Sequence, residues 1–297
     1  MSNTIRLPSF LVAGPPRTGT SWLHEILSQH TSLPSPNKET RFFDVHFGRG
    51  LKWYCGHFPF LYSDRPMGEI APTYFASPQA REHIARTIPH AKLIFTFRNP
   101  VHRIVSMYRA KRAYGRFPWS FEQALHRDPE LLESGKYATH LRAWQRAFPR
   151  NQILVAIYDD LRRDPQSFMD QLVDFIAIPR FVLTKAQLGN VYSSETMTVP
   201  RSFVLTWTGT AIADWCKARR LDKLVATVKT SPLIRLFLGG GSPFPEVSPE
   251  TLRQLYELFR PDVDGLETIL ARDLSVWKAM EPAFSYSACQ DAVGGAL

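Results

Sequence analysis

The sequence predicts an α/β fold, with a parallel sheet flanked by helices in a single domain. Three short apolar runs are typical of buried strands and lie at residues 10–13, 92–97 and 153–158. Each run is followed by a stretch with helical periodicity, and strands that alternate with helices favour parallel pairing. We expect one domain over residues 1–297, with a core at about 8–180 and a helical C-terminal part at about 200–280.

The loop after the first strand has the composition of a phosphate cradle. Residues 14–19 read GPPRTG, and Thr20 and Ser21 open the helix that follows. The amides of such a loop and of a helix N-terminus point at one spot and favour an anion there. Gly14 and Gly19 permit backbone angles and a close approach that other residues resist. The predicted sheet is therefore P-loop-like.

This loop departs from the triphosphate-binding motif G-x-x-x-x-G-K-[ST] at one position. Gly14, Gly19 and Ser21 fit the motif, but Thr20 stands where the motif has Lys. That Lys reaches the β- and γ-phosphates, so its absence argues against an ATPase or a kinase. Arg17 offers a cation from inside the loop instead. A sharp strand-to-helix turn without a ligand is the alternative interpretation.

A second strand-and-helix unit offers another phosphate site. Arg98 directly follows the apolar run 92–97, and Ser106 lies two turns along the helix predicted from about 101 to 114. Ligands of open α/β sheets bind beyond the carboxyl ends of the strands. We therefore expect Arg98 and Ser106 to lie beside the first loop, while a plain surface ion pair is the alternative for Arg98.

Residues 38–44, KETRFFD, place four charged side chains around two adjacent aromatic ones. Charges held against apolar groups are where pKa shifts arise, so this stretch is a candidate for chemistry. A solvated loop above two buried Phe rings is the alternative.

The formal net charge of +9 predicts a basic surface and an anionic partner, such as an acidic glycan or a phosphorylated co-substrate. The chain has no Lys/Arg block of the kind found in nucleic-acid-binding arms, so we expect no nucleic-acid partner. A diffuse basic surface without such a partner is the alternative.

The cysteines indicate neither a disulfide framework nor a metal site. Cys55, Cys216 and Cys289 are scattered, with no metal-ligand spacing. We expect no bound metal and a reduced, cytoplasmic setting. The N-terminus has no long apolar run, so we also expect no signal peptide and no membrane span.

Taken in order, these motifs resemble the sulfotransferases that use 3′-phosphoadenosine 5′-phosphosulfate (PAPS). GPPRTGTSWL at residues 14–23 is similar to the family's 5′-phosphosulfate loop, and IFTFRNPVHRIVSMY at 94–108 is similar to its 3′-phosphate unit. KETRFFD, followed by GLKWY at 50–54 and EIAPTY at 69–74, resembles the heparan sulfate glycosaminyl sulfotransferase branch. The resemblance covers about residues 10–180.

The resemblance implies a site. The residues that would hold the 5′-phosphosulfate are consecutive: Pro16, Arg17, Thr18, Gly19, Thr20, Ser21 and Trp22. Arg98 and Ser106 would hold the 3′-phosphate, and Arg201 would close over the nucleotide. Glu39 matches the family's catalytic base and would take the proton of an acceptor hydroxyl. Arg17 would stabilise charge that develops on the bridging oxygen.

Three positions depart from the glycan branch. Arg17 stands where Lys is common, Arg41 where the acidic motif has His, and Ile70 where the EK-TPAY motif has Lys. Because Arg does not readily donate a proton, Arg17 would act through its charge. We expect positions 41 and 70 to face the acceptor, so these departures bear on its identity.

The sequence thus predicts a sulfotransferase that moves a sulfuryl group from PAPS to a hydroxyl acceptor, first of all a carbohydrate or glycoconjugate. A small phenol, alcohol or lipid is the second choice of acceptor, and a tyrosyl protein is the third. The alternatives from other classes are a P-loop nucleotide kinase or NTPase, and a non-catalytic module that binds nucleotide or anionic glycan.

Overall fold

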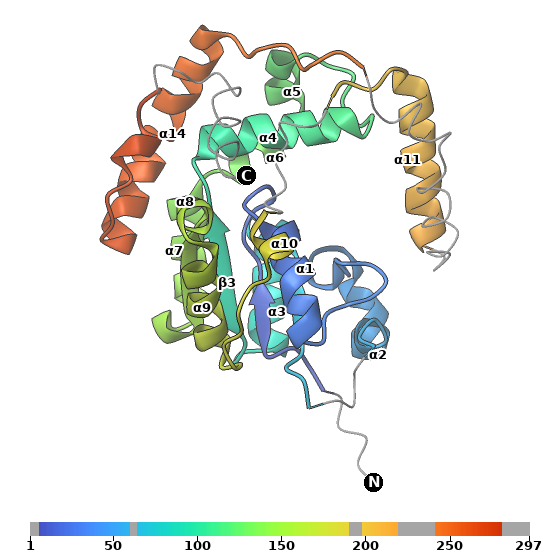
Figure 1. The fold of residues 1–297 in the computed structure, drawn as a ribbon, viewed down its shortest axis with the longest axis vertical. Helices are drawn as coiled ribbons and strands as arrows, with labels where there is room; N and C mark the ends of the chain where they lie inside the picture. The colour runs from blue at the N-terminus through green and yellow to red at the C-terminus, as the bar shows by residue number, and fades with distance from the viewer. Residues whose placement is uncertain (1–5, 60–63, 190–197, 219–240, 281–297) are drawn as a thin grey trace.

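The computed structural model describes residues 6–59, 64–189, 198–218 and 241–280. Within these ranges four strands form one parallel sheet in the order β2-β1-β3-β4. The strands are β1 (Phe10–Val12), β2 (Gly68–Ile70), β3 (Lys92–Phe97) and β4 (Ile153–Ile157). Helices surround the sheet (Figure 1). The predicted α/β class with a P-loop-like parallel sheet is therefore confirmed.

The α-helices that precede β4 in the chain are α1 (Thr20–His30), α2 (Gly50–Cys55), α3 (Pro78–Thr87), α4 (Pro100–Ala113), α5 (Phe121–Arg127), α6 (Glu130–Glu133) and α7 (Tyr137–Ala147). Those that follow β4 are α8 (Tyr158–Arg163), α9 (Pro165–Ile176), α10 (Lys185–Gly189), α11 (Phe203–Ala218) and α14 (Pro249–Leu270). A π-helix spans Phe42–His46, and short 3₁₀ turns lie at Phe47–Arg49, Pro72–Tyr74, Arg150–Gln152 and Ser275–Trp277.

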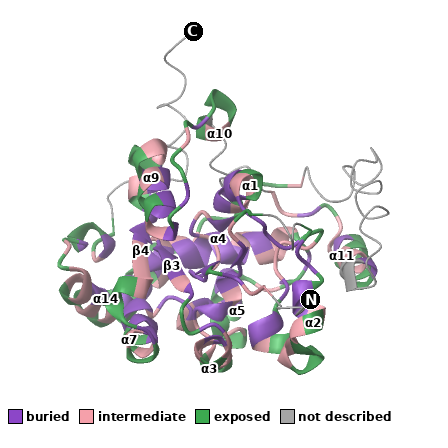
Figure 2. Cartoon of the chain, turned by 90° about the horizontal axis from the view of Figure 1, so that it is seen from below, coloured by how far each residue is buried: buried purple, intermediate pink, exposed green. Residues whose placement is uncertain are grey.

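The two faces of the sheet belong to two hydrophobic clusters, because successive strand residues point to opposite sides. Phe10 and Val12 of β1 join the cluster that includes the buried residues of α1 and α9. Leu11 joins the larger cluster, which includes buried residues of α3, α4, α7 and α14. Figure 2 shows β3 and much of α4 as buried, whereas β4 is partly of intermediate burial.

The helix that carries Ser106 starts where the sequence dictates. Asn99 caps α4, since its side-chain oxygen accepts hydrogen bonds from the amides of Val101 (3.0 Å) and His102 (3.3 Å). Pro100 stands at the first helical position, where its missing N–H costs nothing. The cap holds the first turn of α4 in line with the end of β3, so the position of Ser106 relative to β3 is fixed.

Two elements differ from the sequence-based expectation. The sequence predicts a helix ending at Pro261 and a second helix over 263–274, but α14 continues through Pro261 to Leu270. Asp262 explains part of this continuity, because its carboxylate accepts the amides of Ala138 (2.9 Å) and Thr139 (3.1 Å) at the start of α7. The stretch 42–46, for which a solvated loop is the alternative interpretation, is a π-helix, a form frequent at functional sites.

In the described part of the chain, no helix combines the length and apolar character that crossing a membrane requires. The same residues contain no group of three or more His, Cys, Asp or Glu side chains gathered as metal ligands.

Candidate active site

The first loop and the start of α1 have a geometry that favours an anion. Gly19, the residue before α1, has φ of 90°, and Arg17 has φ of 72°. Intrahelical bonding begins with the Leu23 amide, which donates to the Gly19 carbonyl at 3.1 Å. The amides of Thr20 and Ser21 precede it and have no intrahelical acceptor, and no acidic residue lies in the first turn. A negative group is therefore favoured at this helix end.

The loop is fastened to β3. The Thr18 side chain is buried and donates to the Pro15 carbonyl at 2.7 Å, and its oxygen lies 2.6 Å from Thr96 Oγ1. Gly14 lies so close to β3 that a Cβ there would come within 2.4 Å of the Thr96 backbone nitrogen. These contacts place the loop at the carboxyl ends of β1 and β3, where the strand order reverses and where α/β sheets bind ligands.

The second predicted phosphate unit reaches the first. Arg17 Nε donates to Ser106 Oγ at 3.0 Å, so the loop of β1 touches the helix that follows β3. Arg98 is half-buried, with its guanidinium 4.8 Å from the centre of the Tyr158 ring. Its backbone carbonyl accepts a hydrogen bond from Tyr137 Oη at 2.8 Å. The structure thus brings Arg17 and Ser106 together and holds the main chain at Arg98 in place.

The segment that carries Glu39 also meets the loop. Lys38 Nζ donates to Ser21 Oγ at 3.4 Å. Burial raises the pKa of the Glu39 carboxyl above its ordinary value, the positive charges of Lys38 and Arg41 oppose this rise, and Asp44 adds to it. Burial lowers the pKa of Lys38. The negative charge of Glu39 raises this pKa, and the positive charge of Arg17 lowers it further. The charges of Arg17 and Glu39 both act on Lys38, so the three side chains lie close to one another. Such a cluster of groups with shifted pKa values is typical of a functional site.

The sequence places Lys38 in the charged stretch 38–44, but it predicts no role in the site for Lys38 or His24. Burial, together with the nearby Lys38 charge, lowers the pKa of His24 to about 4, so its ring is neutral at neutral pH. His24 Nε2 is buried and has no hydrogen-bond partner among the described residues. The signal for Lys38 was present in the sequence, since it directly precedes Glu39.

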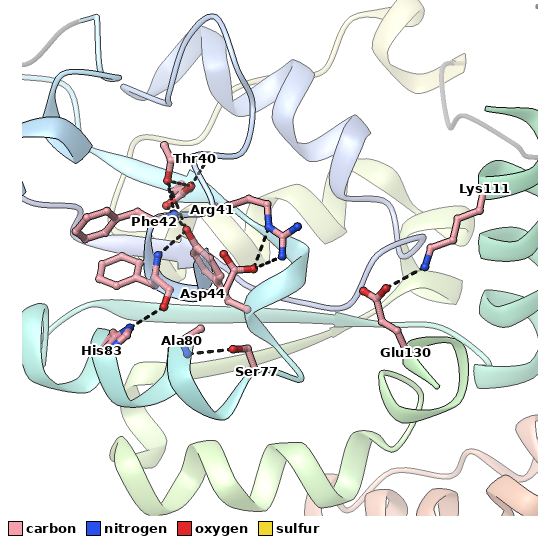
Figure 3. Close-up of polar contacts among 12 residues, drawn as sticks. Thr40, Arg41, Phe42, Asp44, Ser77, Ala80, His83, Lys111 and Glu130 are labelled. Carbon is pink, nitrogen blue, oxygen red and sulfur yellow. Dashed lines mark hydrogen bonds and ion pairs between the residues drawn. The ribbon is translucent and has the colours of Figure 1, made fainter. Parts of the chain in front are cut away.

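Arg41 and Asp44 form an ion pair (Figure 3), and the charges of both residues act on Glu39. Arg41 has φ of 53° and precedes the π-helix, and its Nε and Nη2 donate to Asp44 Oδ2 at 3.0 and 2.7 Å. Asp44 Oδ1 is buried and has no hydrogen-bond partner within the described ranges. Nearby in the same view, Lys111 Nζ pairs with Glu130 Oε2 at 2.9 Å. The Arg41–Asp44 pair thus leaves one buried carboxylate oxygen without a partner in the described part of the chain, and the charges of both residues act on Glu39.

Other predicted site residues lie as follows. Pro16 is half-buried in the loop. The Trp22 ring belongs to the core, where it packs against Phe168, and its Nε1 donates to the Gln187 carbonyl at 2.8 Å. Trp22 can therefore contribute only its backbone amide to a ligand at the start of α1. Arg201 is exposed and lies two residues before α11. The nucleotide contacts of these residues stay predictions.

The expectation that position 70 faces the acceptor is wrong. Ile70 is fully buried and belongs to the cluster that contains the α1 core residues. Its neighbour Glu69 points to the opposite face of the sheet, because side chains alternate along a strand. A Lys missing from position 70 therefore says nothing about the acceptor.

The fold and this site are typical of α/β proteins with a loop suited to an anionic group beyond the end of a parallel sheet. The family model described as "Sulfotransferase domain" matches residues 7–199, which is more than half of the chain. The chain therefore belongs to the sulfotransferase family, and the resemblance to its PAPS-dependent, heparan sulfate-related members is confirmed.

Curated relatives carry heparan sulfate in their names. The chain is 33% identical over 206 residues to bifunctional heparan sulfate N-deacetylase/N-sulfotransferase 2 of Bos taurus, which covers 60% of this chain and 23% of that protein. It is 27% identical over 267 residues to heparan sulfate glucosamine 3-O-sulfotransferase 3B1 of Mus musculus, which covers 86% of this chain and 61% of that protein. The chain thus spans about a quarter of the first relative and less than two thirds of the second.

A solved structure supports the fold. The crystal structure of a sulfotransferase from Alicyclobacillus acidocaldarius superposes with a TM-score of 0.65 at 22% identity, over 93% of this chain and 100% of that chain.

The comparison overturns the predicted cytoplasmic location. The curated relatives are named as enzymes of heparan sulfate, and this association does not fit a cytoplasmic protein. The inference from cysteine content failed because a chain of this size can bury enough apolar surface to fold without disulfides. Thiols without a disulfide framework therefore do not report the compartment.

Proposed function

We propose that the protein transfers a sulfuryl group from PAPS to a hydroxyl group of a glycosaminoglycan-type acceptor, with Glu39 as general base. The observation that carries the proposal is the meeting of the Glu39 segment with the anion-binding loop, through Lys38 Nζ and Ser21 Oγ at 3.4 Å. Membership of the sulfotransferase family selects sulfuryl transfer among the reactions that such a site can support.

The residues present fit a nucleotide with phosphates at both ends of its ribose. The free amides at the start of α1 and the Arg17 guanidinium suit the 5′-phosphosulfate, and Thr20 in place of Lys disfavours a triphosphate. Ser106 and Arg98 suit the 3′-phosphate. The hydrogen bond between Arg17 and Ser106 supports this division, because it sets the two phosphate subsites side by side.

The chemistry that we propose is an in-line displacement at sulfur. The acceptor oxygen forms a bond to sulfur as Glu39 takes its proton, and the bond from sulfur to the bridging oxygen breaks. Adenosine 3′,5′-bisphosphate leaves with the bonding electrons, and Arg17 and Lys38 stabilise the charge that grows on the bridging oxygen. The raised pKa of Glu39 makes its carboxylate a better base than an exposed one.

The proposed acceptor follows from the names of the relatives and from the charges beside Glu39. The Arg41 side chain is 49% exposed and its charge acts on Glu39, which suits contact with an anionic sugar chain. Small phenols, alcohols, lipids and tyrosyl peptides are the competing acceptors that an assay must include.

The test begins with calorimetric titration of the protein with adenosine 3′,5′-bisphosphate, AMP and ATP. We expect the bisphosphate to bind tightest and Arg98→Ala to weaken it about 10- to 100-fold, the value of one or two charged hydrogen bonds. Arg253→Ala is the matched control, because Arg253 is exposed on α14 and pairs with Glu250. Equal or tighter binding of ATP would favour a nucleotide kinase instead.

Turnover is then measured with radiolabelled PAPS and four acceptors: a desulfated heparan-type polymer, a neutral glucan, a phenol and a tyrosyl peptide. Glu39→Gln should lower kcat about 10²- to 10⁴-fold and leave bisphosphate affinity unchanged. Full activity of Glu39→Gln would exclude the proposed base, and bisphosphate binding without transfer to any acceptor would indicate a non-catalytic module.

A further inference from the structure

Glu69 is a buried carboxylate that the proposed reaction does not use. It lies in the middle of β2 with no exposed surface, on the side of the sheet that carries Tyr54 and Tyr74. Its neighbours in the strand are Gly68 and Ile70, so the sequence places one acid in an otherwise uncharged buried strand. A buried carboxylate is costly unless donors surround it, so its partners indicate its purpose.

Four hydrogen bonds converge on Glu69. Oε1 accepts from the Thr40 backbone amide at 2.8 Å and from Thr40 Oγ1 at 2.7 Å. Oε2 accepts from Tyr54 Oη at 2.8 Å and from Tyr74 Oη at 3.1 Å. Three separate elements supply these donors: the segment before the π-helix, α2, and the 3₁₀ turn after β2.

The first of these bonds acts directly on the proposed base. The Thr40 amide belongs to the peptide group that joins Glu39 to Thr40, so Glu69 fixes the orientation of that peptide plane. Thr40 Oγ1 in turn accepts the Phe42 amide at 3.1 Å, which ties the peptide to the first residue of the π-helix. The backbone that carries Glu39 is therefore held by a rigid group inside the sheet.

We propose that Glu69 is the positioning residue of the active site, and that its four hydrogen bonds set the Glu39 carboxylate in line for proton transfer. This inference rests on the proposed function. Because Glu69 has no exposed surface, it acts through the peptide between residues 39 and 40. A misplacement of a reacting group by about 1 Å can cost about 10²-fold in rate.

A purely structural role for Glu69 makes a different prediction. A structural anchor affects stability and leaves the turnover of the folded protein unchanged, whereas a positioning residue lowers kcat in the folded protein. The two roles also differ in their coupling to Glu39, since a residue that works through Glu39 loses its effect when Glu39 no longer acts as a base.

The experiment compares Glu69→Gln, Glu39→Gln and the double variant, after thermal denaturation has shown that each is folded at the assay temperature. Glu267→Gln is the matched control, because Glu267 also accepts a backbone amide, that of Leu274 at 2.7 Å, and lies on α14. We expect Glu69→Gln to lower kcat about 10- to 100-fold, with the affinity for adenosine 3′,5′-bisphosphate changed less than about twofold. Added to Glu39→Gln, it should change kcat less than about threefold.

Two results would overturn the inference. In the first, kcat of Glu69→Gln lies within about twofold of the values for the wild type and Glu267→Gln. In the second, Glu69→Gln lowers kcat by the same factor in the wild type and in the Glu39→Gln background. Hydrogen exchange at the Thr40 amide separates this failure from failure of the proposed function. If the wild type transfers no sulfate, faster exchange at Thr40 alone in Glu69→Gln still supports the positioning of this peptide. Unchanged exchange would refute it.

Discussion

Replacing Glu69 by Gln should change the pH dependence of stability in a direction that the structure specifies. Burial raises the pKa of Glu69 to about 7 from an ordinary value of 4.5, and the hydrogen bonds from Thr40, Tyr54 and Tyr74 only partly oppose this rise. The pKa values of both tyrosines are raised well above 10 by burial, so neither titrates in the same range. Of Glu69, Tyr54 and Tyr74, only the Glu69 carboxyl group therefore titrates near neutral pH and changes the stability there.

The sign follows from proton binding. Between pH 4.5 and about 7 the folded state keeps a proton on Glu69 that the unfolded chain has lost. The stability that this group contributes is thus fully present below pH 4.5 and is lost as pH rises through about 7. Each pKa unit corresponds to about 1.4 kcal/mol, so the full loss is about 3 kcal/mol, most of it between about pH 5 and pH 8.

The assay is chemical denaturation of the wild type and Glu69→Gln at several values from about pH 5 to pH 8. The introduced amide does not titrate, so the difference between the two proteins cancels the histidines and other carboxylates that titrate in both. The unfolding free energy of the wild type relative to Glu69→Gln should fall by about 2–3 kcal/mol over this range. A constant difference would refute the reasoning, and a rise would show that the four donors outweigh burial.

Gly14→Ala should lower the unfolding free energy by about 1–3 kcal/mol, because the added Cβ would lie 2.4 Å from the Thr96 nitrogen. Gly48→Ala is the control, since a Cβ there meets nothing within 4 Å, and equal losses of stability in chemical denaturation would contradict the prediction. Thr18→Val leaves a buried Thr96 hydroxyl unpaired and should cost about 1–3 kcal/mol, with Thr18→Ser as the control that keeps the bond; identical melting curves would oppose it. The acidic limb of the kcat/KM profile should have an apparent pKa above the ordinary glutamate value, because activity grows as Glu39 loses its proton and burial raises the pKa of Glu39. An apparent pKa at the ordinary value would indicate an exposed base.

Much of the fold could be predicted because local patterns and tertiary packing agree. The strand 92–97 has the predicted bounds, since a continuous apolar run marks it. The contact between the two phosphate units was also expected, because parallel strands end at the same edge of the sheet. The hydrogen bond between Arg17 and Ser106 makes this contact between the two units.

The parts that escaped prediction depend on contacts distant in sequence. No propensity encodes the π-helix at 42–46, whose surroundings come from other elements: His83 on α3 contacts the Phe43 carbonyl through Nδ1 at 2.8 Å (Figure 3). The role of Glu69 needs three partners that only the folded chain assembles. The orientation of position 70 depends on the alternation of side chains along β2, which turns Ile70 and Glu69 to opposite faces of the sheet.

The helix α14 has a consequence for how such a chain can vary in length. It lies beyond the residues matched by the family model, yet Asp262 holds the start of α7, Arg272 pairs with Asp160 of α8 at 2.5 Å, and Trp277 Nε1 donates to Asp159 at 2.8 Å. A polypeptide cut at residue 199 would expose the apolar surfaces of α4 and α7 that α14 covers, so we expect it to aggregate. Insertions between 199 and 248 would be tolerated only where they still return the chain to this surface, because α14 covers buried residues of α4 and α7.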